Sequence, residues 1–248
     1  ANLLRLEMPG AATGRFGETE ENEPIYGVAV LTRDRETSTP GRMRLWHLEG
    51  QASASTLDAI RQTSETSGLE CDACVLVPVD LVPAGTQRDG LDELLLLGDG
   101  EAIVFEVEAG GAFVERARFA TTHSFRWVDG ATQPQKYAPR PLVVDLDGDG
   151  ILDVVARATD GTLVAFWGQA DGTLDERELL AAPDSGEATS CGGWAVAVLD
   201  VDGDGVGELV VVGPGTFAFH EIAGRELVPM TGMVDPEALG VTRSEEGR

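Results

Sequence analysis

The sequence predicts an all-β protein, a β-propeller of about four blades that is either a small ring or part of a larger one. Short runs of apolar and β-branched residues recur along the 248 residues, bounded by some of the 31 Gly and 12 Pro. Two near-identical acidic loops start 55 residues apart, at Asp145 and Asp200. Repeats of about 50–65 residues with three or four short strands each are typical of propeller blades, whereas solenoid repeats are usually shorter.

The first unit, about residues 1–52, is the most degenerate of the four. Its leading strand is predicted at Leu3–Leu6, its second at Gly27–Leu31 and its third at Arg42–Leu48. The connecting segment Gly14–Glu23 is acidic but has no regular spacing of carboxylates. We therefore expect strands in this unit and no metal site.

The second unit, about residues 69–118, repeats the pattern with a disrupted loop. Asp80 matches the first acidic position of the later loops, Asp89 the third and Glu93 the last. An insertion, Pro83–Arg88, replaces the middle carboxylate. Apolar runs on both sides of this segment predict strands. We expect a blade here with a weaker metal site.

The third and fourth units, about residues 135–182 and 190–230, each contain a complete nine-residue acidic loop. Carboxylates stand at positions 1, 3, 5 and 9, glycine at position 6 permits a sharp turn, and the backbone carbonyl of position 7 adds an oxygen. Carboxylates this crowded repel one another unless a cation gathers them, and Ca²⁺ prefers six to eight oxygen ligands. The predicted ligands are Asp145, Asp147, Asp149, Ile151 and Asp153 for one ion and Asp200, Asp202, Asp204, Val206 and Glu208 for the other.

The loops differ from an EF-hand, whose twelve-residue loop ends in a bidentate glutamate and lies between two helices. Position 12 is Ala156 in the first loop and Val211 in the second, and both are apolar. The flanking segments, such as Leu142–Val144, are short β-branched runs typical of strands. Each loop is therefore predicted to join two strands at the tip of a hairpin.

An Asp-Gly pair between apolar runs also forms a hairpin turn without any metal. One Asp-Gly-Asp-Gly segment would not separate the two interpretations, but two complete copies with an acidic ninth residue favour calcium. Ions held wholly by protein ligands leave little room for a substrate. We therefore expect two structural Ca²⁺ ions.

These residues carry a family resemblance. The Asp-x-Asp-x-Asp-Gly-x-x-Asp loop between strands, followed by an apolar strand and an Asp-Gly-Thr-Leu element, resembles the FG-GAP/VCBS repeat. The resemblance covers about residues 1–230 and implies blades like those of the integrin α-subunit head and of many bacterial extracellular proteins. It is specific in units three and four, partial in unit two and faint in unit one. Members of the family commonly close into seven blades, whereas four units are visible here.

The chain is strongly acidic, with 43 Asp and Glu against 18 Lys and Arg and a formal net charge of −25. Nucleic acids and anionic membrane surfaces require a basic footprint, so we expect neither as a partner. Saline or calcium-rich surroundings screen such charge, although solubility alone also accounts for it. The chain has no apolar stretch of membrane-spanning length and begins with Ala, without a charged-then-apolar leader. We expect a mature or excised segment that is extracellular, at the cell surface or periplasmic, with no membrane insertion.

The three cysteines leave at least one outside any intramolecular pair. Cys71 and Cys191 each lie nine residues before the first Asp of their loops, so they occupy equivalent places in units two and four. Cys71 and Cys74 form a C-x-x-C pair, but zinc would need two more ligands and a redox site a following helix. A local Cys71–Cys74 disulfide and buried free thiols are both open.

The sequence contains no catalytic motif such as G-x-S-x-G, a P-loop, H-E-x-x-H or a dinucleotide-binding pattern in the right context. His47 and His220 fall in predicted third strands, where packing explains them. His123, Phe125 and Trp127 form the one aromatic cluster off the repeat pattern, which makes them the candidate ligand surface. Anchoring of a loop on the blades would explain the same cluster. We therefore expect no catalytic residues.

The sequence thus predicts a calcium-stabilised extracellular module for binding or adhesion, without catalytic activity of its own. A protein or glycan on an extracellular surface is the expected partner. Two alternatives are a carbohydrate-binding or polysaccharide-processing propeller and a structural spacer in a larger surface protein. Outside the repeat pattern lie a hint of a short helix at Ala54–Ser64 and a polar tail at residues 231–248.

Overall fold

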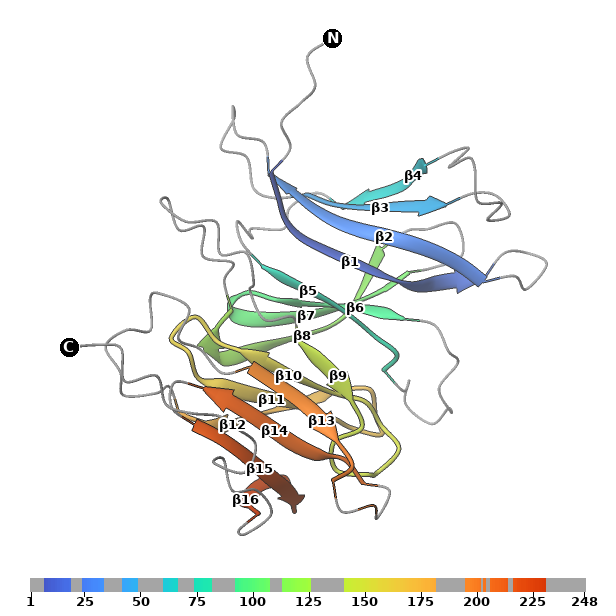
Figure 1. Cartoon of the computed structure of the whole chain (residues 1–248). Coiled ribbons are helices and arrows are strands. Elements are labelled where there is room, and N and C mark those ends of the chain that lie inside the picture. The colour runs from blue at the N-terminus through green and yellow to red at the C-terminus, as the bar shows by residue number, and fades with distance from the viewer. Residues whose placement is uncertain are drawn as a thin grey trace, which may run out of the picture. The chain divides into compact units, whose positions relative to one another are not determined.

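The all-β prediction is confirmed by a computed structural model, in which the described residues form sixteen strands and no helix (Figure 1). The chain divides into two compact units, Ala1–Ala138 with Gly168–Glu176 and Pro139–Trp167 with Arg177–Arg248. None of the described segments is a helix long and apolar enough to cross a membrane. The described residues are 7–18, 24–33, 42–48, 60–66, 74–81, 92–107, 113–125, 141–181, 195–201, 203, 206–213 and 216–230.

The strands form four four-stranded sheets, and each sheet takes its strands from one stretch of the chain, in chain order. Sheet 1 contains β1 (Glu7–Glu18), β2 (Pro24–Arg33), β3 (Arg42–Leu48) and β4 (Ile60–Thr66). Sheet 2 contains β5 (Val75–Val79), β6 (Glu93–Leu97), β7 (Asp99–Val107) and β8 (Phe113–Ser124). Sheet 3 contains β9 (Leu142–Val144), β10 (Asp153–Arg157), β11 (Leu163–Gly168) and β12 (Leu174–Leu180). Sheet 4 contains β13 (Ala195–Leu199), β14 (Glu208–Gly213), β15 (Thr216–Ala223) and β16 (Glu226–Pro229).

The first two sheets extend further than the sequence pattern indicates. The hint of a helix at Ala54–Ser64 is wrong where the structure describes that segment, because β4 pairs antiparallel with β3. Its sequence, IRQTSET, is almost entirely polar, so pairing with a neighbour and not local preference decides its conformation. β1 continues to Glu18, inside the segment expected as a loop, and β8 continues to Ser124, beyond the expected end of unit two. The strand expected at Leu3–Leu6 and the polar tail lie outside the described residues.

Sheet 2 supplies most of the described core of the first unit. Leu94–Leu97 of β6 are fully buried, and Ala102–Phe105 of β7 are nearly so. Both faces of these middle strands are covered, which explains why they read as continuous apolar runs and not as alternating ones. The backbone of Arg15 in β1 is tied to this sheet by Asp92, whose carboxylate accepts the Arg15 N–H at 2.7 Å and whose own N–H donates to the Arg15 carbonyl at 2.7 Å.

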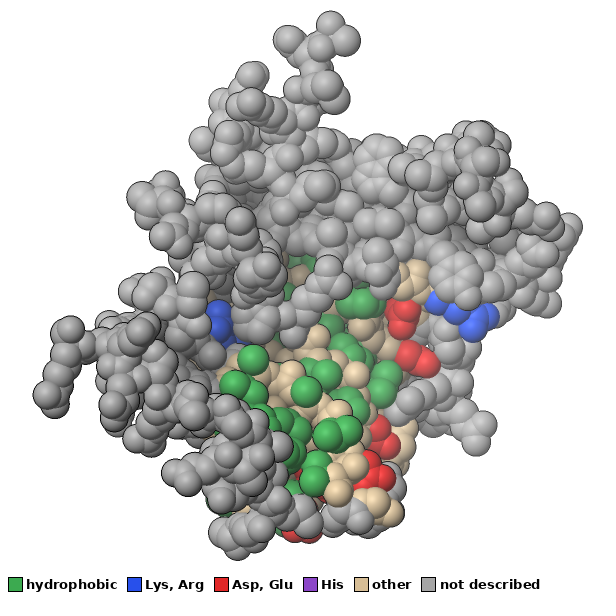
Figure 2. Space-filling model, in the orientation of Figure 1, with side chains coloured by type: hydrophobic (Ala, Val, Ile, Leu, Met, Phe, Trp, Pro, Cys, Tyr) green, Lys and Arg blue, Asp and Glu red, His purple; other side chains and the backbone are tan. Residues whose placement is uncertain are grey.

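Sheets 3 and 4 share one hydrophobic core in the second unit. Val155 of β10 and Trp167 of β11 are buried there together with Leu209 and Val211 of β14. The next residue of β14, Val212, points the other way and is 43 % exposed. On the face drawn in Figure 2, hydrophobic side chains gather over β13, whose alternate residues are exposed. Sheet 4 therefore buries one apolar face against sheet 3 and leaves apolar side chains on the other.

Two Asp-Gly-Thr turns connect the strands of sheet 3 without any need for metal. The N–H of Thr162 donates to Asp160 Oδ1 at 2.9 Å, and the N–H of Thr173 donates to Asp171 Oδ1 at 3.0 Å. The glycine between the Asp and the Thr of each turn has a positive φ, which is 97° at Gly161 and 79° at Gly172. These segments behave as plain Asp-Gly turns. The same sheet thus provides a metal-free comparison for the acidic loop described next.

Candidate metal centre

The acidic loop of sheet 3 closes the hairpin between β9 and β10, as the sequence predicts. Val144 at the end of β9 pairs with Asp153 at the start of β10, and the loop lies between them. Gly148 and Gly150 adopt φ values of 74° and 89°, in the left-handed region that favours glycine. A Cβ at either glycine would meet nothing within 4 Å, so backbone conformation and not space requires glycine there.

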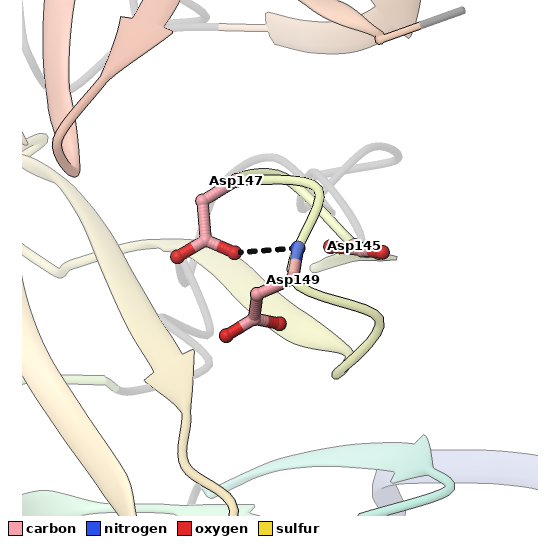
Figure 3. Close-up of side chains that lie close together, drawn as sticks. All are labelled: Asp145, Asp147 and Asp149. Carbon is pink, nitrogen blue, oxygen red and sulfur yellow. Dashed lines mark hydrogen bonds between the residues drawn. The ribbon is translucent and has the colours of Figure 1, made fainter.

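Three carboxylates of this loop lie together (Figure 3). Asp145, Asp147 and Asp149 can each bring one oxygen to within 4.8 Å of the others. This is the one group of three or more potential metal ligands found in the described part of the chain. The arrangement offers hard oxygen ligands on one short loop, as Ca²⁺ requires.

Each of these carboxylates has one oxygen held by the loop's own backbone. Gly150 N–H donates to Asp145 Oδ2 at 2.9 Å, and Ile151 N–H donates to Asp149 Oδ1 at 2.8 Å. Asp149 N–H donates to Asp147 Oδ1 at 3.3 Å, the bond drawn dashed in Figure 3. These bonds fix the orientation of all three side chains without using their second oxygens.

The second oxygens of the three carboxylates are the atoms that could hold a cation in this loop. Asp145 Oδ1 is buried and accepts no hydrogen bond from the described residues. Asp147 Oδ2 and Asp149 Oδ2 instead face the guanidinium of Arg225, at 2.8 and 3.4 Å. A buried carboxylate oxygen without a donor is costly, and a bound cation would satisfy it. The three carboxylates supply the oxygen ligands that a cation needs, and the Arg225 guanidinium already places a positive charge beside two of them.

Asp153, the predicted ninth-position ligand, is fully buried, and its Oδ2 accepts the N–H of Leu146 at 2.8 Å. In sheet 4 the buried Glu208 accepts the N–H of Val201 at 2.6 Å in the same way. Each ninth-position carboxylate thus holds the base of its loop through the residue after the first Asp. Sequence reasoning assigned these residues to the ion and missed this backbone contact, although their place at the start of a buried strand was visible.

The acidic loop of sheet 4 is described only in part, because Asp202 and Asp204 lie outside the described residues. Asp200 is exposed, and its Oδ1 accepts the N–H of Gly203 at 2.7 Å. Gly203 has a φ of 81°, close to the value of Gly148 in the first loop. The described part of this loop therefore bends like its counterpart in sheet 3, and Val206 at position 7 is exposed.

The weaker set predicted in sheet 2 is divided by its insertion. Glu93 is buried and accepts the N–H of Leu81 at 2.7 Å, so it repeats the ninth-position contact of the later loops. Asp80 is partly buried at the first position, and Asp89 lies outside the described residues. Among the described residues, the carboxylates of this loop do not form a group close enough to hold a metal ion.

The aromatic cluster predicted as a ligand surface is anchored in the first unit. His123 Nδ1 lies 3.0 Å from Glu176 Oε1, and both Thr122 and His123 donate their N–H groups to the Glu176 carboxylate. Phe125 is 1 % exposed and donates its N–H to the carbonyl of Gly98 at 2.8 Å, and Trp127 lies outside the described residues. The described members of the cluster thus hold the end of β8 in place.

The structure also describes His220 and Cys74, two residues that the sequence analysis discussed. His220 is buried in β15, the third strand of sheet 4, and burial lowers the pKa of its imidazole below the ordinary value. Cys74 is disulfide-bonded, whereas Cys71 and Cys191, the two other cysteines of the chain, lie outside the described residues. The disulfide at Cys74 removes the free-thiol alternative for that residue.

Comparison with known families identifies part of the chain. Residues 145–211 match the profile of the FG-GAP-like repeat. The match begins at the first carboxylate of the sheet 3 loop and ends within β14, so it spans both complete acidic loops. No curated protein matches the chain. The predicted resemblance to FG-GAP repeats is thereby confirmed for this segment.

Proposed function

We propose that this chain, which carries an FG-GAP-like repeat at residues 145–211, is a calcium-stabilised extracellular binding or adhesion module without catalytic activity of its own. The observation that carries the proposal is the convergence of Asp145, Asp147 and Asp149 on one hairpin loop. The partly described loop of sheet 4 supplies a second site of the same kind. Both ions are structural in this proposal.

Calcium would complete what the loop leaves unsatisfied. The second oxygens of Asp145, Asp147 and Asp149 and the carbonyl of Ile151 would hold the ion, together with any oxygen that Asp153 can spare. In the sheet 4 loop the corresponding residues are Asp200, Asp202, Asp204, Val206 and Glu208. The ion neutralises repelling carboxylates in a protein of net charge −25 and fixes the hairpin between two strands.

The four sheets are proposed to be blades of a β-propeller. Each sheet contains four strands in chain order, and sheets 3 and 4 bury facing apolar surfaces in one core. Stacking of successive sheets in this way is how propellers are built. The proposed ring consists of these four blades or of these blades together with others.

An extracellular, cell-surface or periplasmic location is supported by two features. Cys74 is disulfide-bonded, and disulfides persist mainly in oxidising compartments. The acidic surface suits surroundings in which calcium and salt are abundant. The proposed partner is a protein or glycan on such a surface.

Isothermal titration calorimetry of the whole chain with Ca²⁺ tests the metal sites. We expect two ions per chain, one ion after D147N/D149N, and one ion after D200N/D204N. A matched control is D160N/D171N, which removes the same charge from the two metal-free turns of sheet 3 and keeps two ions. Equal heats for all four proteins, or no binding in any of them, would exclude these loops as the sites.

A further inference from the structure

Arg225 occupies a strained position at the tip of the hairpin between β15 and β16. Ala223 pairs with Glu226, so Gly224 and Arg225 form a two-residue turn, with φ values of 60° and 68°. Both values are left-handed, as a type I′ turn requires, and such a turn favours glycine or asparagine at the second position. Arg225 is the one non-glycine residue with a positive φ in the described part of the chain. A side chain held in this conformation points to a role that offsets the strain.

The side chain of Arg225 reaches from sheet 4 to the acidic loop of sheet 3. Its Nε lies 2.8 Å from Asp147 Oδ2 and its Nη2 lies 3.4 Å from Asp149 Oδ2. Its guanidinium carbon lies 5.5 Å from the ring centroid of the buried Trp167, within the range of a cation–π contact. Only 21 % of the side chain is exposed, so these contacts are partly shielded from solvent.

The oxygens that Arg225 contacts are the ones an ion would need. Backbone N–H groups hold Asp147 Oδ1 and Asp149 Oδ1, which leaves the two Oδ2 atoms as the outward ligands of these side chains. A guanidinium and a divalent ion held close together at these oxygens repel each other, so each weakens the binding of the other. Arg225 and the ion therefore compete for Asp147 and Asp149.

We propose that Arg225 is a built-in counter-cation that occupies the sheet 3 loop when calcium is absent and sets the calcium concentration at which the loop is filled. This inference rests on the proposed calcium site. In the metal-free chain Arg225 neutralises part of the loop and links sheet 4 to it. Calcium displaces the guanidinium from the carboxylates, and the Trp167 ring remains as its neighbour.

The test compares R225Q and R225K in the whole chain, with D200N/D204N present throughout to silence the sheet 4 loop. R118Q is the matched control, because Arg118 pairs with Glu115 and Glu101 on the exposed surface of sheet 2. Calcium affinity is measured by calorimetry, and the melting temperature is measured in EDTA and in saturating Ca²⁺. The second readout reports the apo state independently of binding.

R225Q is expected to bind Ca²⁺ about tenfold more tightly than the chain with Arg225. A tenfold change in the dissociation constant corresponds to the loss of a competing interaction of about 1.4 kcal/mol. R225K keeps the charge but loses the planar fork, so its affinity is expected to lie between the two. R225Q should melt at a lower temperature in EDTA and at an unchanged temperature in saturating Ca²⁺. R118Q should bind Ca²⁺ like the parent chain.

The inference is overturned if the parent chain binds Ca²⁺ and R225Q binds it no more tightly than R118Q does. That result leaves the proposed calcium site intact. If neither the parent chain nor any variant binds Ca²⁺, the proposed calcium site is wrong, and the proposed competition by Arg225 is wrong as well. Binding by R225Q alone would support the inference in its strongest form. Should R225Q fail to fold in both buffers, the affinity of R225K decides, and a value equal to that of the parent chain overturns the inference.

Discussion

Glu93 accepts the backbone N–H of Leu81 at 2.7 Å, across a loop that has lost the regular spacing of the later acidic loops. Asp153 makes the same bond to Leu146 in sheet 3, and Glu208 makes it to Val201 in sheet 4. The three bonds join the start of the second strand to the residue that follows the first Asp. We call this bond the clamp. It recurs in all three sheets, including sheet 2, where the described residues form no carboxylate cluster.

Loss of the clamp in sheet 2 should destabilise the chain irrespective of calcium. Replacement of Glu93 by Leu removes the charged acceptor of the Leu81 N–H and leaves it the more distant Val79 carbonyl, at 3.1 Å. The lost bond to a charged acceptor should cost about 1–3 kcal/mol of unfolding free energy. Glu93→Gln keeps an acceptor oxygen and should cost less. Urea unfolding in EDTA and in Ca²⁺ measures both variants.

The control for this comparison is Glu106→Leu in the same sheet. Glu106 forms an exposed ion pair with Arg116, and such pairs contribute about 0–1 kcal/mol. If E93L and E106L lowered stability equally, the clamp would have no special role.

Val211 and Val212 are neighbours in β14 with opposite surroundings. Val211 is fully buried between sheets 3 and 4, whereas Val212 is 43 % exposed on the other face. V211A removes two buried methyl groups and should cost about 2 kcal/mol, while V212A should change stability by less than about 0.5 kcal/mol. Denaturant unfolding of the two variants is the measurement. Equal losses would show that a further surface covers the Val212 face in solution.

His220 should make the chain less stable in mild acid. Burial lowers the pKa of the folded imidazole, whereas the unfolded imidazole titrates near its ordinary value of about 6.5. As the pH falls through that value, the unfolded state takes up a proton that the folded state resists. The stability that neutral His220 provides is therefore fully present above about pH 6.5 and declines below it.

Unfolding free energies of the wild-type chain and of H220F, measured between pH 7.5 and 5.5, test this account. Phenylalanine keeps a buried ring and does not titrate, so other groups contribute alike to both proteins. The stability of the wild-type chain relative to H220F should fall as the pH is lowered. A constant difference across this range would rule out His220 as the source.

The sequence contained enough to place the acidic loop of sheet 3 between two strands, because β-branched runs flank it and position 12 is apolar. It did not reveal β4, a polar strand whose conformation depends on pairing with β3. It did not distinguish Asp153 from the other acidic residues, because a buried carboxylate bound to Leu146 and an ion ligand have the same letter and spacing. The distinction depends on hydrogen bonds that only the folded hairpin makes.

Arg225 was beyond sequence reasoning for a similar reason. Gly224-Arg225 between two strand-like runs was recognisable as a turn, but its partner Asp147 lies 78 residues earlier in the chain. Contacts at that separation follow from how sheets 3 and 4 pack, and no local pattern encodes them.

Thermal unfolding of the whole chain in EDTA, followed by titration with Ca²⁺, tests the central claim most directly. Ion binding to the folded state alone should raise the melting temperature by about 5–10 °C at a hundredfold excess over the dissociation constant. D147N/D149N should lose a large part of that increase, whereas D160N/D171N should keep it. A melting temperature that stays the same from EDTA to millimolar Ca²⁺, with no ion bound, would contradict the proposal that calcium holds these loops.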